Sequence, residues 1–583
     1  MSDNIISLYR AKFAGEKGSL RKDWGGKISI ALAYPNNYRV GMSNLGFQVV
    51  YSLLNSRDDV VAERIFLPDD KETALYRGYG KGLLSIETQS PLSRFDIIAF
   101  SLSFENDYPN ILKILDLGKI PLLAKDRDGN HPFVMAGGVT TFLNPEPIAD
   151  FFDFFLLGEA ESNLESFLHH FKGAIKTDTS RREILEVLAK GVRSVYVPSF
   201  YSITYNDNGT IKSREPIIGT IPEKIKVDRL NAKDLPVNRS SILTEETEFA
   251  GKVLLELGRG CGRSCRFCAA GYIYRPPRVH DEKDVLSCLN STMDKCSSIG
   301  LLSASVLDSP GIEDIASLII KKGGDFSVSS LRADLLTSEM LTLLKGTGQK
   351  TLAIAPEAGS ERLRYVINKH LTEKQILDAA GMIAAAEDFS IRLYFLMGLP
   401  TETMDDVKEI LGLVKSIKHN VVRESKTRGR IGQIRLSVNC FIPKPFTPFQ
   451  WFPMEETSIL KKKQKWLKKV ISKEGGVRVS FDVPKWAYLQ ALLSMGDRRV
   501  SSMIMSAHEF DGDWARTFRH SDLNPDFFVY RPKEFDENLP WDFMDNGIRK
   551  EFLIKEYKLA LKEKESEICN VGECDRCGVC KLP

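Results

Sequence analysis

Glu256-Leu-Gly-Arg-Gly-Cys261-Gly-Arg-Ser-Cys265-Arg-Phe-Cys268-Ala-Ala-Gly271 is the stretch of the chain that says most about its fold and chemistry. It spaces three cysteines as Cys-x3-Cys-x2-Cys, directly after an apolar run at residues 252–257 that predicts a strand. Three thiolates this close together can ligate three irons of a cubane cluster. Protein clusters normally use four cysteines, so the missing fourth leaves one iron open to another ligand. The stretch therefore predicts an iron–sulfur cluster with one exchangeable position, in a loop that follows a strand.

Five more strand-like runs follow this loop, with amphipathic helical patterns between them. Strands that alternate with helices predict parallel pairing, and six such units over roughly 200 residues fit a complete or partial β/α barrel of the TIM type. Active sites of such barrels lie in the loops after the strands, which is where the cysteine stretch falls. The six runs are residues 252–257, 300–305, 325–330, 351–354, 390–395 and 433–439.

An earlier alternation of strands and helices extends from about residue 27 to residue 170. Near-continuous apolar strands separated by helices predict a doubly wound parallel sheet, which binds ligands at the carboxyl ends of its strands. A helix is predicted at residues 45–54, and a β-hairpin at 195–205 and from 211 onward. The predicted strands are residues 27–34, 95–103, 132–137 and 152–157.

The fold class is therefore α/β, and 583 residues are too many for a single core. We place a doubly wound, Rossmann-like domain at residues 1–175 and a connector with the hairpin at 176–250. The partial β/α barrel covers 251–475, and a small cysteine-rich C-terminal region covers 476–583.

The other cysteines bear on what the loop binds. None of the ten cysteines precedes Cys261, and four lie at the end as Cys569-x4-Cys574-x2-Cys577-x2-Cys580. Tight cysteine clusters in a cytosolic protein indicate metal sites rather than disulfides. For the first cluster the alternative is a zinc knuckle or three structural cysteines. Zinc would need a fourth nearby ligand, and the next histidine is His280.

The Cys-x3-Cys-x2-Cys loop resembles the signature of the radical S-adenosylmethionine (SAM) superfamily. In that family the open iron is chelated by the amino and carboxylate groups of SAM. An electron from the cluster then breaks the sulfonium bond and makes a 5′-deoxyadenosyl radical. The resemblance implies that Cys261, Cys265 and Cys268 hold a [4Fe–4S] cluster and that the ring of Phe267 packs near the adenine.

Polar segments after the later barrel strands agree with this resemblance. Ordinary loop glycines and capping carboxylates are the alternative for each segment taken alone, but their order, each after a strand, favours a SAM site. The implied contacts are Ser303 and Asp308 near the methionyl amino group, Ser330 and Arg332 at the carboxylate, Glu357 at the ribose, and Gly398 and Glu402 near the adenine.

The whole arrangement is similar to a subgroup of that family with an N-terminal cobalamin-binding-type domain and a cysteine-rich tail. One departure is that the Asp-x-His-x-x-Gly motif, which supplies a histidine ligand to cobalt, is absent. The resemblance permits cobalamin without that ligand, or a domain that packs against the barrel or admits substrate. Residues that carry the resemblance include Ser101-Leu-Ser103, Ala136-Gly-Gly-Val139, Gly158-Glu-Ala-Glu161 and Arg259-Gly-Cys261.

The four tail cysteines predict a second metal centre, either a [4Fe–4S] cluster or a structural zinc. We favour the cluster, because a radical SAM enzyme already requires iron–sulfur assembly. A full set of four ligands indicates electron transfer or folding rather than a second SAM site. A reductant of the flavodoxin or ferredoxin class is the expected electron donor.

Charge and hydropathy indicate whether the chain binds nucleic acid or a membrane and where in the cell it is expected. The 80 basic and 77 acidic side chains leave a net charge of +3, which gives no reason to expect a nucleic acid or a membrane surface. The N-terminus has no apolar signal region and no run approaches 18 apolar residues, so a cytoplasmic enzyme is expected. A lysine-rich run at residues 461–473 could contact RNA, although a solvated helix face is the more common outcome.

The sequence thus predicts an enzyme that cleaves SAM reductively to modify an unknown substrate, by hydrogen abstraction or by cobalamin-assisted methyl transfer. The alternative is a non-catalytic iron–sulfur or zinc protein with a role in RNA binding. A methylthiotransferase is disfavoured, because such proteins carry an N-terminal cysteine-bearing domain and this chain has no cysteine before residue 261.

Overall fold

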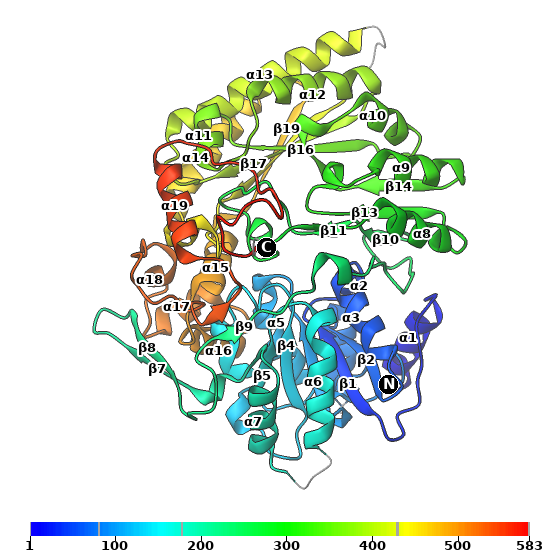
Figure 1. Cartoon of the computed structure of the whole chain (residues 1–583), viewed down its shortest axis with the longest axis vertical. Coiled ribbons are helices and arrows are strands. Elements are labelled where there is room, and N and C mark those ends of the chain that lie inside the picture. The colour runs from blue at the N-terminus through cyan, green and yellow to red at the C-terminus, as the bar shows by residue number, and fades with distance from the viewer. Residues whose placement is uncertain (1, 80–81, 176–178, 427–430, 581–583) are drawn as a thin grey trace.

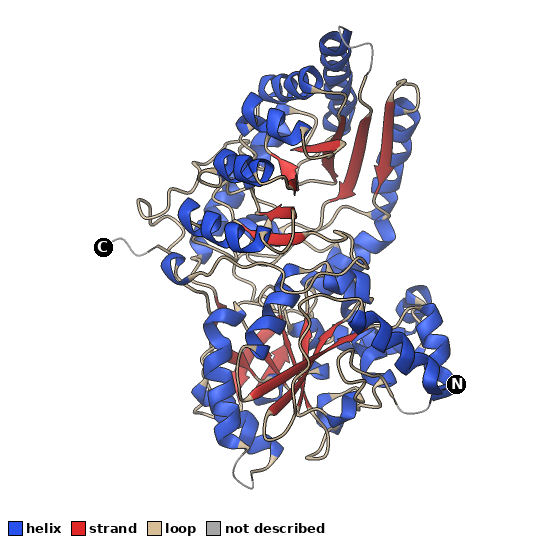
Figure 2. Cartoon of the chain, turned by 90° about the vertical axis from the view of Figure 1, so that its right-hand side faces the viewer, coloured by secondary structure: helices blue, strands red, loops and turns tan. Residues whose placement is uncertain are grey.

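The computed structural model describes residues 2–79, 82–175, 179–426 and 431–580. Figure 1 shows two α/β halves, the N-terminal half below and the barrel half above, with the C-terminal helices α15–α19 along one side of both. Figure 2 shows that each half has its own sheet with helices around it. No helix in these ranges is both long enough and apolar enough to cross a membrane.

The N-terminal half is built on a six-stranded sheet in the order β2-β1-β3-β4-β5-β6, in which only β6 runs antiparallel. This order is that of a doubly wound fold, with the ligand-binding edge at the carboxyl ends of its strands. The strands are β1 (Ile28–Tyr34), β2 (Val60–Phe66), β3 (Ile97–Ser101), β4 (Phe133–Gly137), β5 (Phe154–Leu156) and β6 (Val195–Tyr196). The helices are α1 (Ser2–Ala14), α2 (Tyr38–Met42), α3 (Leu45–Asn55), α4 (Asp70–Tyr79), α5 (Tyr108–Leu117), α6 (Ala160–Ala174) and α7 (Arg181–Gly191).

Strand β2 was not among the predicted strands, because two charged residues interrupt its apolar pattern. Arg64 is fully buried and pairs with Glu16 at 2.6 Å and with Glu87 at 2.6 Å. Neighbouring Glu63 accepts from the Trp24 indole at 2.8 Å. Every residue of β2 is buried, so these charges are compensated inside the sheet rather than at its surface.

The barrel half contains a three-stranded sheet, β10-β13-β14, and a five-stranded sheet, β15-β16-β17-β18-β19, in which all pairs are parallel. Only Ser329 separates β14 from β15, so the chain passes directly from one sheet into the other. The partial barrel predicted from the sequence is therefore confirmed, with β10 and β19 as its outer strands. The strands are β10 (Val253–Glu256), β13 (Ser298–Leu302), β14 (Asp325–Val328), β15 (Ser330–Leu331), β16 (Thr351–Glu357), β17 (Ser390–Met397), β18 (Ile434–Cys440) and β19 (Val477–Phe481).

Helices follow most of these strands, and α10, α11, α12 and α13 begin at side-chain caps. Helix α13, for example, starts at a capping box in which Thr403 and Asp406 satisfy each other's backbone amides. The helices are α8 (Glu282–Met293), α9 (Ile312–Lys321), α10 (Ser338–Lys345), α11 (Glu361–Val366), α12 (Glu373–Ala386), α13 (Met404–Ser425) and α14 (Thr457–Ile471). Strand β19 lies beyond residue 475, so the sheet continues past the limit that we predicted for the barrel; the other domain limits stay predictions.

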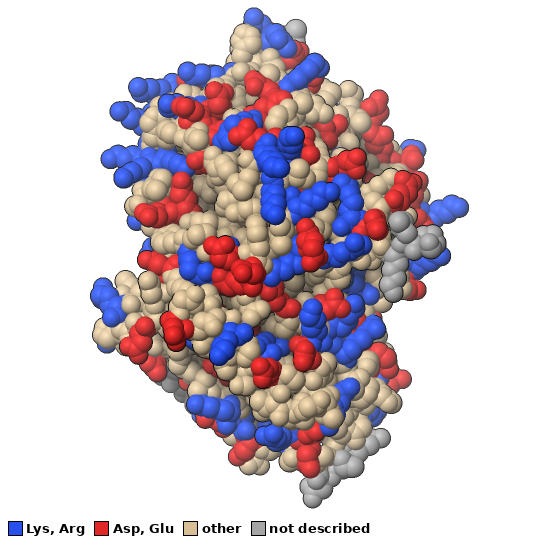
Figure 3. Space-filling view, turned by 60° about the vertical axis from the view of Figure 1, so that its left-hand side comes forward, with Lys and Arg blue, Asp and Glu red and all other residues tan. Residues whose placement is uncertain are grey.

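The lysine-rich run forms helix α14. Six of its seven lysines, at positions 461, 462, 465, 468, 469 and 473, are exposed, whereas Lys463 is buried. Figure 3 shows basic and acidic side chains interspersed over the face that it displays, in keeping with the small net charge. Contact of this helix with RNA stays a prediction.

The C-terminal helices connect the two halves. Helix α16 packs against α5 of the N-terminal half, and Asn144 donates to the carbonyls of Ser494 and Gly496 at 3.0 and 2.7 Å. Lys444, after β18, pairs with Glu105, after β3. The carboxyl edges of both sheets are thereby held facing each other. These helices are α15 (Pro484–Met495), α16 (Val500–Glu509), α17 (Trp514–His520), α18 (Asp526–Val529) and α19 (Lys550–Leu561).

Two smaller strand pairs complete the fold. The predicted hairpin is present as β7 (Tyr201–Tyr205) and β8 (Ile211–Pro216), which pair antiparallel. Strand β9 (Ile225–Lys226) pairs in parallel with β20 (Met544–Asp545) and so ties the connector to the C-terminal region.

Candidate active site

The cysteine loop is closed at its base by a two-stranded clasp. Strand β11 (Gly258–Arg259) follows β10 and pairs antiparallel with β12 (Arg278–Val279), so the two ends of the loop lie side by side. Gly260 has φ +80°, and a Cβ there would meet Tyr274 at 3.0 Å. A glycine is therefore needed where the two sides of the loop approach each other. As predicted, the loop follows the first barrel strand.

The three cysteines of this loop share one environment. Burial raises the pKa of Cys268 to about 12, and the nearby Cys265 and Cys261 add to the effect. Burial also raises the pKa of Cys265, while Lys369 and Arg332 act in the opposite direction. The backbone amides of Gly271 and Ala270 donate toward the Cys268 sulfur. These amides and cations favour thiolates, although burial alone disfavours them.

Within the described residues, no three Cys, His, Asp or Glu side chains converge as tightly as a bound metal ion requires. The donor set still fits a cluster. Three neighbouring thiols next to Lys369 and Arg332 provide soft ligands and positive charges that offset the negative charge of an iron–sulfur centre. Cys261, Cys265 and Cys268 are therefore the residues that would hold it.

Ion pairs connect several of the predicted SAM residues around this loop. Arg263, which lies between two of the cysteines, pairs with Asp308, and Arg332 donates to Asp334 at 2.9 Å. Glu357 pairs with Lys369 at 3.2 Å. Burial works against the charge of Lys369, but Glu357 outweighs it and raises the pKa of the lysine. Ser303 and Ser330 follow β13 and β14, as predicted from the sequence.

Phe267 and Gly398 lie on another side of the loop. Phe267 packs in a small apolar cluster with Leu396 and Leu399, which flank Gly398 after β17. Glu402 accepts from the Gly398 amide at 3.0 Å and from buried Lys463 at 2.7 Å. Glu402 thus has a structural role in holding this turn. Its predicted contact with SAM stays a prediction, as do the other SAM contacts.

Strained backbone is concentrated near the loop. Five residues other than glycine have positive φ in the segments around it: Ser264 (+59°), Glu357 (+65°), Asn368 (+56°), His370 (+53°) and Thr401 (+63°). Each such conformation costs about 1–3 kcal/mol and persists where the surrounding structure enforces it, which is typical of ligand sites. Glu357 has the largest of these angles and also sits at a register shift between β16 and β17.

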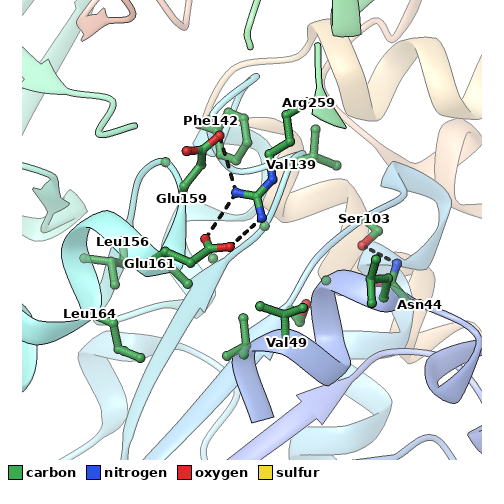
Figure 4. Close-up of a pocket in the computed structure, with 18 of the residues that line it drawn as sticks. Asn44, Val49, Ser103, Val139, Phe142, Leu156, Glu159, Glu161, Leu164 and Arg259 are labelled. Atoms are coloured by element: carbon green, nitrogen blue, oxygen red, sulfur yellow. Dashed lines mark hydrogen bonds and ion pairs between the residues drawn. The ribbon is translucent and has the colours of Figure 1, made fainter. Parts of the chain in front are cut away.

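Arg259, immediately before the cysteine loop, had no role predicted from the sequence. It donates to Glu256 at 2.8 Å and pairs with Glu161 at the start of α6 (Figure 4). Burial opposes the charge of Glu161, but Arg259 outweighs it and lowers the pKa of the carboxyl. Glu159 pairs with Arg278 at 2.6 Å. The N-terminal sheet is thereby joined to both strands of the clasp.

A cavity of about 600 Å³ lies beside these pairs, between the two halves. Its deep part is apolar and is bounded by α3, α6 and strands of the N-terminal sheet, including Val49, Leu156 and Leu164 (Figure 4). Its polar part includes Asn44, whose side chain donates to Ser103 at 3.1 Å, and residues of the clasp. No histidine is among its described lining residues, which agrees with the absent cobalt-ligand motif.

Two features of the cavity indicate a ligand. Gly138 and Gly158, after β4 and β5, have φ of +104° and +111°, and a Cβ at either would collide with backbone at 2.4 Å or less. Glycine is therefore required where these strand ends pass close to the backbone of Leu102 and Asp228 at the rim of the cavity. The Oδ1 of Asn163 is buried without a hydrogen-bond partner within the described residues. An unpaired buried acceptor costs about 1–3 kcal/mol unless a ligand or water satisfies it.

The four-cysteine tail packs directly on the cysteine loop. The Cys569 amide donates to the Gly262 carbonyl at 2.8 Å. Arg275, which is buried, donates to Ser264 Oγ and to the Gly271 carbonyl at 2.7 Å each, and also to the Cys577 sulfur. Arg266, between Cys265 and Cys268, pairs with Glu556 of α19 at 3.1 Å. The sequence showed both clusters but not that they are neighbours.

The tail also has the chemistry of a metal site. Burial opposes ionisation of Cys574, but the side chain and amide of Arg576 and the amide of Asn570 donate to its sulfur and lower the pKa of the thiol. Burial raises the pKa of Cys569, and Cys574, Cys577 and Cys580 add to this effect while Arg275 opposes it. Four thiols in such surroundings fit either zinc or an iron–sulfur cluster.

Two family models match separate parts of the chain. The model of the radical SAM superfamily matches residues 255–414, and a model described as radical SAM proteins, N-terminal, matches residues 46–198. An uncharacterized protein of Methanocaldococcus jannaschii is 31% identical over 481 residues, which cover 82% of this chain and 90% of that protein. A tRNA-2-methylthio-N(6)-dimethylallyladenosine synthase of Neorickettsia sennetsu is 24% identical over 303 residues, 46% of this chain and 61% of the synthase.

Solved structures are less similar. The radical SAM methyltransferase TsrM from Kitasatospora setae, with cobalamin and a [4Fe–4S] cluster bound, is 12% identical and has a TM-score of 0.45. That comparison covers 73% of this chain and 74% of TsrM. The cobalamin-dependent radical SAM enzyme OxsB, with aqua-cobalamin and SAM bound, is 14% identical, has a TM-score of 0.43 and covers 92% of this chain and 79% of OxsB.

Proposed function

This chain belongs to the radical SAM superfamily, and from that premise we propose that its radical chemistry modifies a substrate held between the two sheets, with methylation as the favoured reaction. The superfamily assignment makes it an enzyme that cleaves SAM reductively at a [4Fe–4S] cluster and forms a 5′-deoxyadenosyl radical. The purely metal-binding alternative is not favoured. The chain's residues bind SAM, exclude water and orient the substrate, while the cofactor supplies the radical chemistry.

One observation carries the proposal of methylation. The cavity reaches from the apolar slot between α3 and α6 to Arg259, Gly260 and Ala270 of the cysteine loop. A cofactor bound there would therefore lie next to the SAM site. Cobalamin is the cofactor that we propose; it would supply a methyl carrier. Asn163, whose Oδ1 has no partner within the described residues, and the lining glycines Gly138 and Gly158 are the residues that would contact it.

The test is product analysis after anaerobic incubation of reconstituted protein with SAM and a strong reductant. 5′-Deoxyadenosine reports radical formation, and S-adenosylhomocysteine reports methyl transfer from SAM. Radical formation without S-adenosylhomocysteine would leave the superfamily chemistry in place and argue against methylation. The physiological reductant, of the flavodoxin or ferredoxin class, stays a prediction.

We expect Leu164→Trp to block cobalamin binding. Leu164 lines the slot from α6, and the larger indole would fill space that the ligand needs. Binding of hydroxocobalamin, followed by absorbance after gel filtration, should weaken by at least about tenfold. Val187→Trp on exposed α7 is the matched control and should bind normally. Equal binding by Leu164→Trp and wild type, or no retention by wild type, would rule out this site.

We also propose that the tail cysteines hold a second metal centre, a [4Fe–4S] cluster in preference to zinc. Metal analysis of the reconstituted chain should give about eight irons, or about four irons and one zinc if the tail binds zinc. Replacing Cys574 and Cys577 together with alanine should remove one centre. Replacing Cys288 and Cys296, which lie in neither cluster, is the control. Unchanged metal content in the tail variant would contradict the proposal.

A further inference from the structure

Three arginines form a row across the last three strands of the barrel sheet. Arg392 of β17 is in register with Arg435 of β18, and Arg435 is in register with Arg478 of β19. Neighbouring strands are about 4.8 Å apart, so the three side chains leave the same face of the sheet next to one another. Like charges placed side by side in this way are destabilising. A bound anion would relieve this repulsion.

The alternation of burial shows which face carries the row. Ile391, Leu393 and Phe395 of β17 are buried in the hydrophobic core, whereas Arg392 and Tyr394 between them are only half-buried. The same alternation continues on β18, and on β19 Arg478 is exposed. The arginines therefore lie on the face away from the core, which is open to solvent at β19.

No carboxylate of the described residues pairs with this row. Within the described residues none of the three arginines has an ion pair, and the only side-chain hydrogen bond joins Arg435 to the amide oxygen of Gln433 at 3.1 Å. The Nε atoms of Arg392 and Arg435 are buried without a hydrogen-bond partner. An arginine on an ordinary solvated face would give its Nε to water. The guanidinium groups of Arg392 and Arg435 thus retain unused hydrogen-bond donors, and they lie next to other positively charged side chains.

The same face carries further polar groups toward the carboxyl ends of the strands. Tyr394, Ser437 and Ser480 form the next row in register, and Asn439 follows on β18. From Arg392 to the end of β17 at Met397 is roughly 16 Å along the strand, at 3.3 Å per residue. The face runs from the arginines through the row of Tyr394 to Leu396, which belongs to the same apolar cluster as Phe267 of the cysteine loop. Gly398 of the predicted SAM site follows at the end of the strand.

We propose that this arginine row, Arg392, Arg435 and Arg478, binds phosphate groups of the substrate, so that the substrate is a phosphorylated molecule long enough to reach the SAM site. The inference rests on the proposed function, since it names the substrate class for that site. Guanidinium groups bind phosphate oxygens in pairs, and hydroxyls add single hydrogen bonds. Three adjacent positive charges match a group with several negative charges better than a single carboxylate.

The experiment measures binding to the reconstituted full-length chain by calorimetry, without reductant. The probes are tripolyphosphate, a 5′-phosphorylated single-stranded RNA oligonucleotide and citrate. The Arg392→Gln/Arg435→Gln double variant should bind the phosphorylated probes at least about tenfold more weakly than wild type. The control is Lys468→Gln/Lys469→Gln on exposed α14, which removes the same charge and should change binding less than about twofold.

The two phosphorylated probes separate the sources of phosphate. Arginine-dependent binding of tripolyphosphate alone indicates a small phosphorylated substrate, and arginine-dependent binding of RNA indicates a nucleic-acid backbone. Either result supports the proposal. It is overturned if neither probe binds, if the lysine variant loses as much affinity as the arginine variant, or if citrate binds more tightly than both.

Folding and function are controlled separately. Removing like charges should leave the thermal unfolding midpoint of the arginine variant unchanged or raised. If that variant does not fold, Arg478→Gln is tested instead, because Arg478 is exposed and its replacement should not disturb the fold. Arg478→Gln should weaken binding of the phosphorylated probes about threefold. Unchanged binding by this variant would overturn the proposal. SAM cleavage by wild type is a different assay, so its failure would count against the proposed function and not against the arginine row.

Discussion

Cys265→Ala is expected to reduce 5′-deoxyadenosine formation by at least about 100-fold, to the background of the assay. Substitutions that only orient metal ligands cost up to about 100-fold, and loss of a ligand itself should cost at least as much. Cys265 lies between the other two cysteines in the loop, next to Lys369 and Arg332. Chromatographic quantification of 5′-deoxyadenosine, together with iron content and the electron paramagnetic resonance signal of the reduced cluster, checks the prediction.

Cys288→Ala is the matched control for this experiment. Cys288 lies on α8, belongs to neither cysteine cluster, and its thiol donates to the Val237 carbonyl at 3.9 Å. The control should keep wild-type iron content and product formation. Normal turnover by Cys265→Ala with a full complement of iron would contradict the assignment of the loop as the SAM cluster site.

Arg64→Met should lower the free energy of unfolding of the N-terminal half by about 3–5 kcal/mol. Removing one partner of a buried ion pair leaves the other charge uncompensated. Here the change would leave both Glu16 and Glu87 without their arginine partner, and the side chains of these two residues are at most 1% exposed. Urea unfolding, followed by circular dichroism and tryptophan fluorescence, measures this change in the free energy of unfolding. Because the chain has several domains, the first unfolding transition is the relevant one.

Arg57→Met provides the comparison for Arg64. Arg57 also pairs with a carboxylate, Asp59 at 3.1 Å, but both side chains are about a quarter exposed. Exposed pairs contribute about 0–1 kcal/mol, so this variant should unfold almost as wild type does. Similar losses for the two variants would show that burial of the Arg64 pairs is not what stabilises β2.

The sequence was most informative where a local pattern sufficed. Each of the six apolar runs predicted for the barrel contains a strand, and the cysteine loop followed the first of them as expected, but β19 was not predicted. Strand β2 was missed because Glu63 and Arg64 look like surface residues until Glu16 and Glu87 are placed beside Arg64. The burial of Lys463 was missed for the same reason. This residue lies in a run of solvated lysines, yet it is buried against Glu402.

Contacts between segments that are distant in sequence account for the features of the fold and site that were not predicted. Arg259 and Glu161 are 98 residues apart in sequence, and Arg266 and Glu556 are 290 apart. No periodicity or spacing rule links such pairs, because they depend on how the two halves and the C-terminal region pack. The arginine row could not be predicted either, because the alignment of its three residues depends on the register of three strands in the folded sheet.

The packing of the tail on the cysteine loop has a consequence for how the protein is made. The barrel is synthesised before residues 569–577, and domains generally fold N-terminal first during synthesis. The segment that covers Gly262 and supplies Cys577 to Arg275 therefore reaches the cysteine loop only after that loop has been made. The surroundings of the first cluster are complete only when this segment has packed onto the loop. A variant in which the chain stops a few residues before Cys569 would keep both sheets and still leave the radical site without one of its walls.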